Sequence, residues 1–139
     1  MEESIVIRET RPDDKPFILN SWLKSYKDES LFAAEIRNDI YYKWHNEIIQ
    51  RILERGTTKI LVAASKEDSD VIAGYLVTEK IRGYDIAHYV YVKRAFNGLG
   101  ICKLLFQISP LKYTSHMTRA GRPVAEKAGI IYVPYFLFI

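Results

Sequence analysis

Two glycines in the second half of the chain, Gly98 and Gly100, stand where the backbone could bind an anion. They follow a stretch rich in Tyr and Val, residues 85–93, and precede an apolar stretch, residues 101–108. Glycine has no Cβ, so a ligand can approach its backbone closely. The amides of residues 98–102 would lie at the start of a helix. Unpaired amides at the positive end of a helix dipole bind phosphate groups. The spacing predicts a pyrophosphate site, although an ordinary glycine turn would give the same spacing.

Two common phosphate-binding motifs do not fit these glycines. A dinucleotide-binding fingerprint requires a third glycine three residues after Gly100, where the sequence has Lys103. A P-loop requires a Gly-Lys-Ser/Thr run, which the sequence lacks. Lys103 itself could neutralise a ligand phosphate or simply lie on a solvated helix face.

Three histidines are the candidate groups for proton transfer, because imidazole ionises near neutral pH. His88 has the strand parity of Ile86 and Val90, which predicts a position facing the interior or a cleft. His116 stands in a Thr-Ser-His-Met-Thr run, where polar side chains gather before a turn. The alternatives to catalysis are a hydrogen-bonded core histidine at 88 and a loop stabilised by its own polar side chains at 116. His45 flanks an apolar helix stripe and is predicted to be structural, with substrate contact as the alternative.

Neither a disulfide nor a metal site is predicted. The single cysteine excludes an internal disulfide and fits a reducing compartment. The three histidines are far apart in the sequence and have no close-spaced ligand partner, so no metal is expected. Cys102 stands at the start of the helix predicted after the glycines, where a thiolate would be favoured. Packing beside a ligand is the interpretation that we prefer for it.

Length and composition restrict the class of protein. The chain has 139 residues, which fits one domain, and its hydrophobic content of 48% argues against intrinsic disorder. The net charge is only +3, and the sequence has no cluster of basic residues, so nucleic acid is not expected as a partner. A nucleic-acid-associated factor is kept only as an alternative. There is no apolar run of membrane-spanning length and no apolar leader after Met1, so a cytoplasmic protein is predicted.

Hydrophobic periodicity predicts the elements that position these groups. Strands are expected over residues 4–8, 59–64, 71–79, 85–93, 113–117 and 130–138. Helical segments are expected over residues 16–26, 31–37, 39–55, 101–108 and 122–127. Asp13 or Asp14 would cap the first helix, Gly56 would end the third in a left-handed conformation, and Pro110 would stop the fourth. With the short segment 31–37 not counted as a separate helix, the order β α α β β β α β α β predicts one mixed α/β domain over residues 1–139.

The sequence ends in an apolar run, residues 132–139. An exposed apolar edge promotes association, so this run is expected to be covered by its own sheet or by a second subunit. A homodimer through this segment is therefore predicted.

In this order of elements the chain resembles the GNAT N-acetyltransferases. Their motif after the fourth strand, Arg/Gln-x-x-Gly-x-Gly/Ala, is similar to residues 90–102, with Asn97 at the basic or Gln position and Cys102 at a small-residue position. Residues 5–14 resemble the first strand and a Pro-Asp-Asp helix start of that family. Residues 71–75 and 126–130 resemble its I-x-G-Y/F and E-K-x-G-F segments. The stretch 113–122 also resembles small acetyltransferase-like proteins of tailed phages.

The resemblance implies a single GNAT-like domain that binds acetyl-CoA or another acyl-CoA. The fold would be a mixed, mostly antiparallel central sheet flanked by helices. The pantetheine arm would pair with the backbone near Tyr91 and Val92. The residues implied around the pyrophosphate are Asn97, Gly98, Leu99, Gly100, Ile101 and Cys102.

The implied reaction is N-acyl transfer, in which an amine attacks the thioester directly. The amine must lose a proton, with His116 or His88 as the predicted base, and a strand amide near Val90 or Val92 would stabilise the carbonyl oxygen. The family often has a Tyr acid at the position of Ala125, so Tyr132 and Tyr135 are the nearest candidates in the sequence to protonate the leaving thiolate.

A catalytically weak or inactive GNAT-fold module that acts through CoA or protein binding is the alternative function. Ala125, Asn97 and the apolar C-terminal run favour it. The class of acceptor amine stays open, because no loop carries a recognisable code. The aromatic residues that could line an acceptor cleft have helical spacing, which predicts core packing first: Tyr26, Tyr41, Tyr42 and Trp44.

Overall fold

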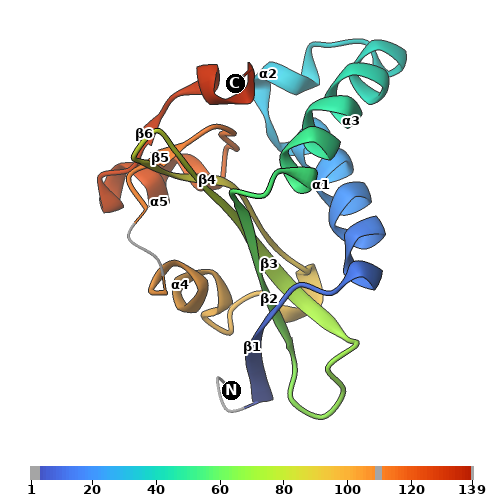
Figure 1. The fold of residues 1–139 in the computed structure, drawn as a ribbon, viewed down its shortest axis with the longest axis vertical. Coiled ribbons are helices and arrows are strands. Elements are labelled where there is room, and N and C mark those ends of the chain that lie inside the picture. Colours follow the sequence, from blue (N-terminus) through green and yellow to red (C-terminus); the bar gives the residue numbers. More distant parts are fainter. Residues whose placement is uncertain (1–3, 109–110, 139) are drawn as a thin grey trace.

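The computed structural model describes residues 4–108 and 111–138, and a mixed β-sheet forms its centre (Figure 1). Within these residues the strands are β1 (Ile5–Glu9), β2 (Thr58–Ser65), β3 (Ile72–Ile81), β4 (Tyr84–Val92), β5 (Tyr113–Thr114) and β6 (Ile131–Tyr132), which lie in sequence order across the sheet. The first four strands pair antiparallel, whereas β4–β5 and β5–β6 pair parallel. The predicted fold class, a mixed and mostly antiparallel sheet flanked by helices, is confirmed.

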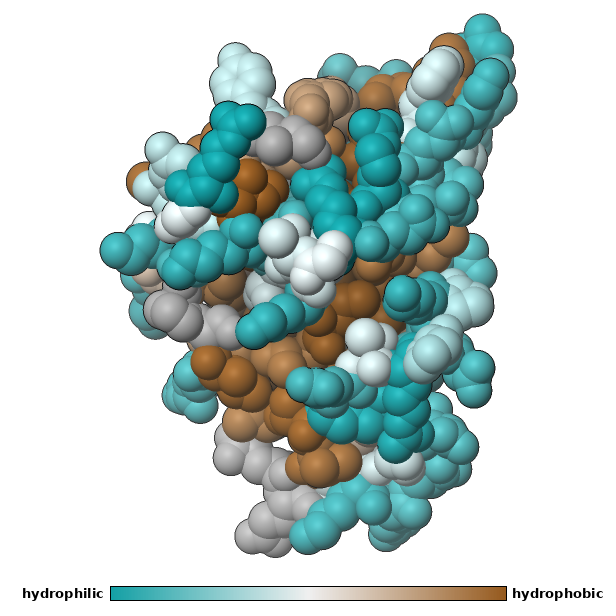
Figure 2. Space-filling view, in the orientation of Figure 1, coloured by the Kyte–Doolittle hydropathy of each residue, from teal (hydrophilic) through white to brown (hydrophobic). Residues whose placement is uncertain are grey.

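Helices cover both faces of the sheet. On one face lie α1 (Lys15–Glu29), α2 (Leu31–Ala34) and α3 (Asn38–Glu54), and on the other lie α4 (Ile101–Phe106) and α5 (Gly121–Ala128) (Figure 1). Short 3-10 helices are η2 (Pro12–Asp14), η3 (Arg94–Phe96) and η4 (Pro134–Phe138). In the same orientation the surface is mostly hydrophilic, with hydrophobic side chains visible between polar ones (Figure 2). Among the helices of residues 4–108 and 111–138, none has the length and apolar character that a membrane span requires.

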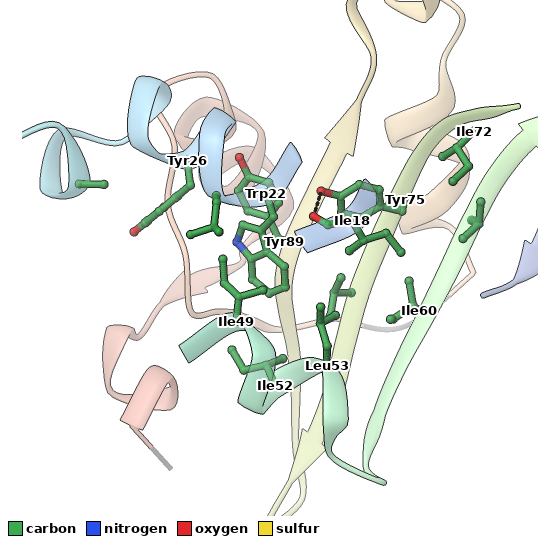
Figure 3. Close-up of a cluster of buried hydrophobic side chains, with 14 of the residues drawn as sticks. Ile18, Trp22, Tyr26, Ile49, Ile52, Leu53, Ile60, Ile72, Tyr75 and Tyr89 are labelled. Atoms are coloured by element: carbon green, nitrogen blue, oxygen red, sulfur yellow. Dashed lines mark hydrogen bonds between the residues drawn. The ribbon is translucent and has the colours of Figure 1, made fainter. Parts of the chain in front are cut away.

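The larger hydrophobic core lies between the sheet and the α1–α3 layer. Trp22 of α1 stacks on Tyr89 of β4 with ring centroids 5.2 Å apart, and Ile49 of α3 is fully buried beside them (Figure 3). Tyr75 of β3 donates a hydrogen bond of 3.1 Å from its hydroxyl to the carbonyl oxygen of Ile18. The predicted apolar stripe of α1 therefore faces the sheet. In α3 the buried face runs through Tyr41, His45, Ile49 and Ile52, so His45 and Ile49, expected only beside the stripe, belong to it, whereas Trp44 is exposed.

The third strand approaches the fourth closely at Gly74. A Cβ on this residue would lie 2.5 Å from the carbonyl oxygen of Tyr91, a separation that real Cβ atoms do not adopt. The steric requirement accounts for a glycine in the segment 71–75, on which part of the family resemblance rests.

Asp14 is buried at the start of α1, but its carboxylate does not cap that helix as predicted. It accepts a hydrogen bond of 2.7 Å from the amide of Arg11 and forms an ion pair, also 2.7 Å, with Arg8 of β1. The hydrogen bond from Arg8 is the main reason why the pKa of Asp14 lies below its usual value. The carboxylate thus ties the first strand to the turn before α1.

The prediction of a left-handed Gly56 was wrong. The helix α3 ends at Glu54, and Arg55 leaves it in an extended conformation with φ −70° and ψ 139°. Gly56 is not one of the glycines with positive φ. The chain turns into β2 through a short turn in which the Thr58 amide donates to the Arg55 carbonyl.

The C-terminal strand predicted over residues 130–138 is reduced to the two residues of β6. Pro134 has no amide hydrogen to donate, so the chain leaves the sheet there and forms η4. In η4, Phe136 and Leu137 are buried while Tyr135 and Phe138 are exposed. The segment is thus partly covered by its own chain, and the predicted homodimer stays a prediction. Residues 110 and 139, named in two of the predictions above, lie outside the described ranges.

Candidate active site

The fourth and fifth strands separate after a short common stretch, and this fork is the centre of the candidate site. Their pairing consists of Ile86 with Tyr113 and Ala87 with Thr114. Against β3, the register shifts so that Val77 pairs with Tyr89 and Thr78 with Ala87, which leaves His88 as an extra, bulged residue in β4. The bulge breaks the predicted parity: Ala87, not Ile86, lines the same cavity as Val90.

A cavity of about 250 Å³ opens at this fork, between β4, α4, α5 and the loop after β5. We call it the fork cavity. Six of the residues singled out in the sequence line it: Val90, Val92, Asn97, Cys102, His116 and Ala125. The side chain of Tyr91 lies elsewhere, because it stacks on Tyr75 with ring centroids 5.4 Å apart.

The glycine turn leads from β4 into α4 beside this cavity. Gly98 and Gly100 have φ of 83° and 76°, values that favour glycine. The first hydrogen bond of the helix runs from the amide of Leu104 to the carbonyl of Gly100. The amides of residues 101–103 are those of its first turn, and such amides have no partner within their own helix. Leu99 is half-buried in the same turn, and Ile101 is buried under it.

Cys102 packs in this region rather than ionising. Burial raises the pKa of its thiol above the ordinary value. A helix N-terminus would have had the opposite effect on the thiol. The packing interpretation of Cys102 is therefore the one that the structure supports.

The three histidines, which are far apart in the sequence, meet in one buried chain of hydrogen bonds. His45 Nε2 lies 3.0 Å from His116 Nε2, and His116 Nδ1 lies 2.9 Å from Ser115 Oγ. Ser115 Oγ lies 2.6 Å from His88 Nδ1, and His88 Nε2 lies 2.8 Å from Glu79 Oε1. We call this chain the histidine relay: His45, His116, Ser115, His88 and Glu79.

Glu79 is nearly fully buried, yet three donors hold its carboxylate in the ionised form. His88 and Arg55 contact Oε1 at 2.8 and 3.0 Å, and Thr57 donates to Oε2. Burial alone would raise the pKa of Glu79, but the hydrogen bonds from His88 and Thr57 and the charge of Arg55 lower it below its usual value. A buried carboxylate with these partners is an anion at neutral pH.

The imidazoles of the relay are neutral at neutral pH. Burial lowers the pKa of His45 to about 4 and that of His116 well below its ordinary value. Burial also lowers the pKa of His88, although the hydrogen bond to Glu79 opposes this effect. Within the described residues no cluster of His, Cys, Asp and Glu is arranged to hold a metal ion.

The remaining candidates from the sequence lie apart from the relay. Tyr135 is 76% exposed on η4 and does not line the fork cavity. Tyr132 is half-buried on β6. Ala125 reaches the cavity but offers no hydroxyl group. Of the predicted proton-transfer residues, the structure thus brings His88 and His116 together and leaves Tyr135 outside.

The aromatic residues divided between core and surface. Tyr26 and Tyr41 are buried as predicted, and the ring of His45 stacks between them with both centroid distances at 5.1 Å. Tyr42 and Trp44 are exposed, so the prediction of core packing was wrong for these two. Trp44 and His45 help to line a second, apolar cavity of about 130 Å³ between α2, α3 and η4, which we call the helix cavity.

Sequence reasoning missed Glu79 and Ser115. Glu79 is a carboxylate in a mostly apolar strand of which all residues but Lys80 are buried, a position where a charge is expected only with a partner. Ser115 directly precedes His116 and was considered only as part of a polar cluster. The charged residue within a mostly apolar strand was the available signal for Glu79.

Comparison with solved structures gives the class of the fold. The chain superposes on YycN of Bacillus subtilis, assigned as an acetyltransferase, with a TM-score of 0.66 and 13% identity over 91% of this chain and 92% of that one. A predicted acetyltransferase of Clostridium acetobutylicum, solved with acetyl-CoA, gives 0.65 and 16% over 91% and 89%. A GNAT-family acetyltransferase of Staphylococcus aureus Mu50 gives 0.52 and 20% over 76% and 62%.

These likenesses show that the chain has the fold of the GNAT acetyltransferases. No family model matches the sequence, and no curated protein sequence matches it. At sequence identities of 13 to 20% the superpositions show the fold alone. The activity has to be argued from the site.

Proposed function

We propose that the protein is an acyl-CoA-dependent N-acyltransferase that moves an acyl group, with acetyl as the first candidate, from CoA to an amine. The observation that carries the proposal is the convergence on one cavity of the strand fork, of Asn97 and Cys102 at the two ends of the glycine turn, and of the relay residue His116. Acetyl-CoA in the Clostridium acetobutylicum neighbour supports the choice of cofactor.

The residues around the fork cavity fit an acyl-CoA in character. The amides of residues 98–102 suit the pyrophosphate, because left-handed Gly98 and Gly100 turn the backbone into the start of α4. The pairing of β4 with β5 ends at Ala87, so the β5-facing edge of β4 beyond it is available to the amides of a pantetheine arm. Apolar Val90 and Val92 would exclude water from the thioester.

The chemistry requires that the attacking nitrogen loses a proton as the carbon–nitrogen bond forms. When bound, the thioester supplies the acyl group and a thiolate leaving group. The chain supplies edge amides near Val90 and Val92 for the developing charge on the carbonyl oxygen. It also supplies the neutral imidazoles of the relay, because His116 lines the fork cavity. Ala125 offers no acid to the thiolate.

Calorimetric titration with acetyl-CoA, compared with CoA alone, tests the cofactor site. Gly100→Val should weaken binding at least tenfold, because a β-branched side chain opposes positive φ and would displace the turn. Gly83→Val is the matched control, since Gly83 has φ of 87° in the β3–β4 turn. Unchanged affinity in Gly100→Val, with the fold intact, would contradict the assignment.

A CoA-binding module without transfer activity is the second candidate, and Ala125 in the cavity wall favours it. The two functions differ in thiol release. With acetyl-CoA and a panel of spermidine, phenethylamine and a lysine-containing peptide, a transferase releases CoA in proportion to amine concentration. Binding without amine-dependent release would favour the module.

A further inference from the structure

The ionised carboxylate of Glu79 determines the direction of every hydrogen bond in the histidine relay. An anion accepts, so neutral His88 donates from Nε2 and has its lone pair on Nδ1. Ser115 then donates its hydroxyl hydrogen to His88 and accepts from His116 Nδ1. His116 accepts at Nε2 from His45 Nε2. His45, the last member of the relay, therefore has its lone pair on Nδ1.

This lone pair of His45 lies at the helix cavity. Tyr26 and Tyr41 stack on the two faces of the His45 ring, so the ring reaches the cavity with its edge. Nε2 points to His116, which lines the fork cavity instead. In the described part of the structure no protein group donates to Nδ1, and Nδ1 is not among the unpartnered polar atoms that the protein encloses completely. A small molecule in the helix cavity can thus reach this acceptor.

The other residues around the helix cavity are apolar or aromatic, and they divide by exposure into a floor and a rim. The buried floor consists of Tyr41, His45 and Leu137, and the exposed rim consists of Phe32, Ile40, Trp44 and Phe138. The Tyr41 hydroxyl is not available to a ligand, because it donates to the carbonyl oxygen of Leu23 at 2.6 Å. Among the side chains of the floor, His45 is therefore the one that offers a free hydrogen-bonding atom.

The size and lining of the helix cavity fit a molecule with a single ring. Its volume is about 130 Å³. An apolar protein cavity of about 150 Å³ binds benzene, so one aromatic ring fits a space of this order. Ligand sites typically combine hydrophobic and aromatic walls with a few polar groups that fix the orientation of the ligand. Here the polar group is an acceptor, so the matching ligand carries a donor on its ring.

The charges near the helix cavity favour a neutral ligand. The ammonium group of Lys27 lies 5.6 Å from the centroid of the Tyr41 ring. The ammonium group of Lys43 lies 5.2 Å from the centroid of the Trp44 ring. A cationic ligand on these rings would meet charges of its own sign, and an anion would face the lone pair of His45.

We propose that the helix cavity is a binding site for a neutral one-ring phenol, whose hydroxyl group donates a hydrogen bond to His45 Nδ1. The ring of the phenol packs against the aromatic and aliphatic side chains of the floor and rim. This site does not depend on the proposed function. The hydrogen-bonded pair of His45 and His116 lies between the two cavities, so the phenol is a second ligand and not the acceptor of the acyl group.

Nitrogen-15 NMR of the labelled protein at neutral pH tests the proposal without a variant, because the chain has only three histidines. The free protein should carry hydrogen on His45 Nε2 and none on Nδ1. Phenol should bind with a dissociation constant of about 1 mM or lower, a value within reach of so small a ligand. It should shift the Nδ1 resonance of His45 at least threefold more than toluene, which has the same ring but no donor. The nitrogens of His88, at the other end of the relay, are the internal control.

Two results of this titration would overturn the proposal. One is hydrogen on His45 Nδ1 in the free protein, since that nitrogen could then accept no hydrogen bond. The other is a phenol titration that leaves the His45 Nδ1 resonance unmoved. Tetramethylammonium binding more tightly than phenol would indicate a cation site and would overturn it as well.

Two variants test the location of the phenol. Ile48 is half-buried in the wall of the helix cavity, so Ile48→Trp should fill part of the space and weaken the binding of phenol and of toluene at least tenfold. Val71→Trp is the control, because Val71 is exposed directly before β3 and lines neither cavity. Equal phenol affinities in the two folded variants would place the ligand elsewhere and contradict the proposal.

Discussion

The two faces of the sheet are packed in different ways. The α1–α3 face is filled by large, fully or nearly fully buried side chains such as Trp22, Tyr75 and Ile49. The α4–α5 face has the small side chains of Ala63, Ala73 and Ala87 among larger aliphatic ones, and it contains the fork cavity. One face therefore supplies most of the stability, and the other leaves room for a ligand. The relay crosses between them at the strand fork.

The largest expected effect compares one buried aliphatic residue from each face. Ile49→Ala should lower the free energy of unfolding by about 4 kcal/mol, because the tight aromatic core around it cannot collapse into the space. Leu105→Ala, equally buried on α4, should cost about 2 kcal/mol, because α4 is short and lies beside open space. Urea denaturation measures both values. Equal losses would contradict the contrast between the faces.

Asp14→Asn should cost about 2 kcal/mol, since it removes a buried ion pair with Arg8. The pKa of Asp14 is lowered in the folded protein, so its contribution is present above the ordinary pKa of the carboxyl and is lost as the pH falls through the folded pKa. Unfolding followed between pH 2 and pH 6 should show a smaller loss of stability in acid for the variant. A variant that loses stability in acid as steeply as the unaltered protein would exclude this pair as the source.

Ala125→Phe should weaken acetyl-CoA binding at least tenfold, or about 1.4 kcal/mol, because the ring would occupy the fork cavity. Its free energy of unfolding should change by less than about 1 kcal/mol, because the added atoms enter existing space. Ala128→Phe, on the exposed side of the same helix, is the control for calorimetry. Equal affinities in the two variants would place the ligand elsewhere.

The smallest effect concerns the thiol of Cys102. Because burial raises its pKa, iodoacetamide at neutral pH should alkylate Cys102 more slowly than it alkylates glutathione. Acetyl-CoA in the fork cavity should slow the reaction further. Mass spectrometry of the time course measures both rates, and a Cys102 faster than glutathione would show an activated thiolate instead.

Periodicity and turn residues were sufficient for most of the fold. The antiparallel strands and the long α3 helix follow from apolar spacing, since each buries a continuous stripe. The parallel strands β5 and β6 are too short to show alternating apolar residues, and β6 ends before Pro134, which has no amide hydrogen to donate. Four segments in the right order, residues 5–14, 71–75, 90–102 and 126–130, indicated the GNAT fold, which the superpositions then showed.

The candidate site could be predicted in part. The glycine turn and His116 were found because their signals are local. The relay could not be found, because it joins α3, β3, β4 and the segment after β5, and His45 and His116 are 71 positions apart. No local sequence pattern indicates which elements lie side by side. The role of Glu79 becomes visible only from the residues that the fold places next to it.

The bulge at His88 has a consequence for how this chain can change in length. Side chains alternate along a strand, so one extra residue exchanges the two faces for everything on one side of it. Deleting His88 itself would remove the bulge and leave Ala87 paired with Thr78 and Tyr89 with Val77, although the imidazole that contacts Glu79 would be lost. Deleting any other residue of β4 would turn the side chains on one side of the deletion to the opposite face of the sheet. The turn at residues 66–70 lies outside the strands and has no such constraint. Insertions and deletions in natural variants should therefore accumulate in that turn and, within β4, be confined to position 88.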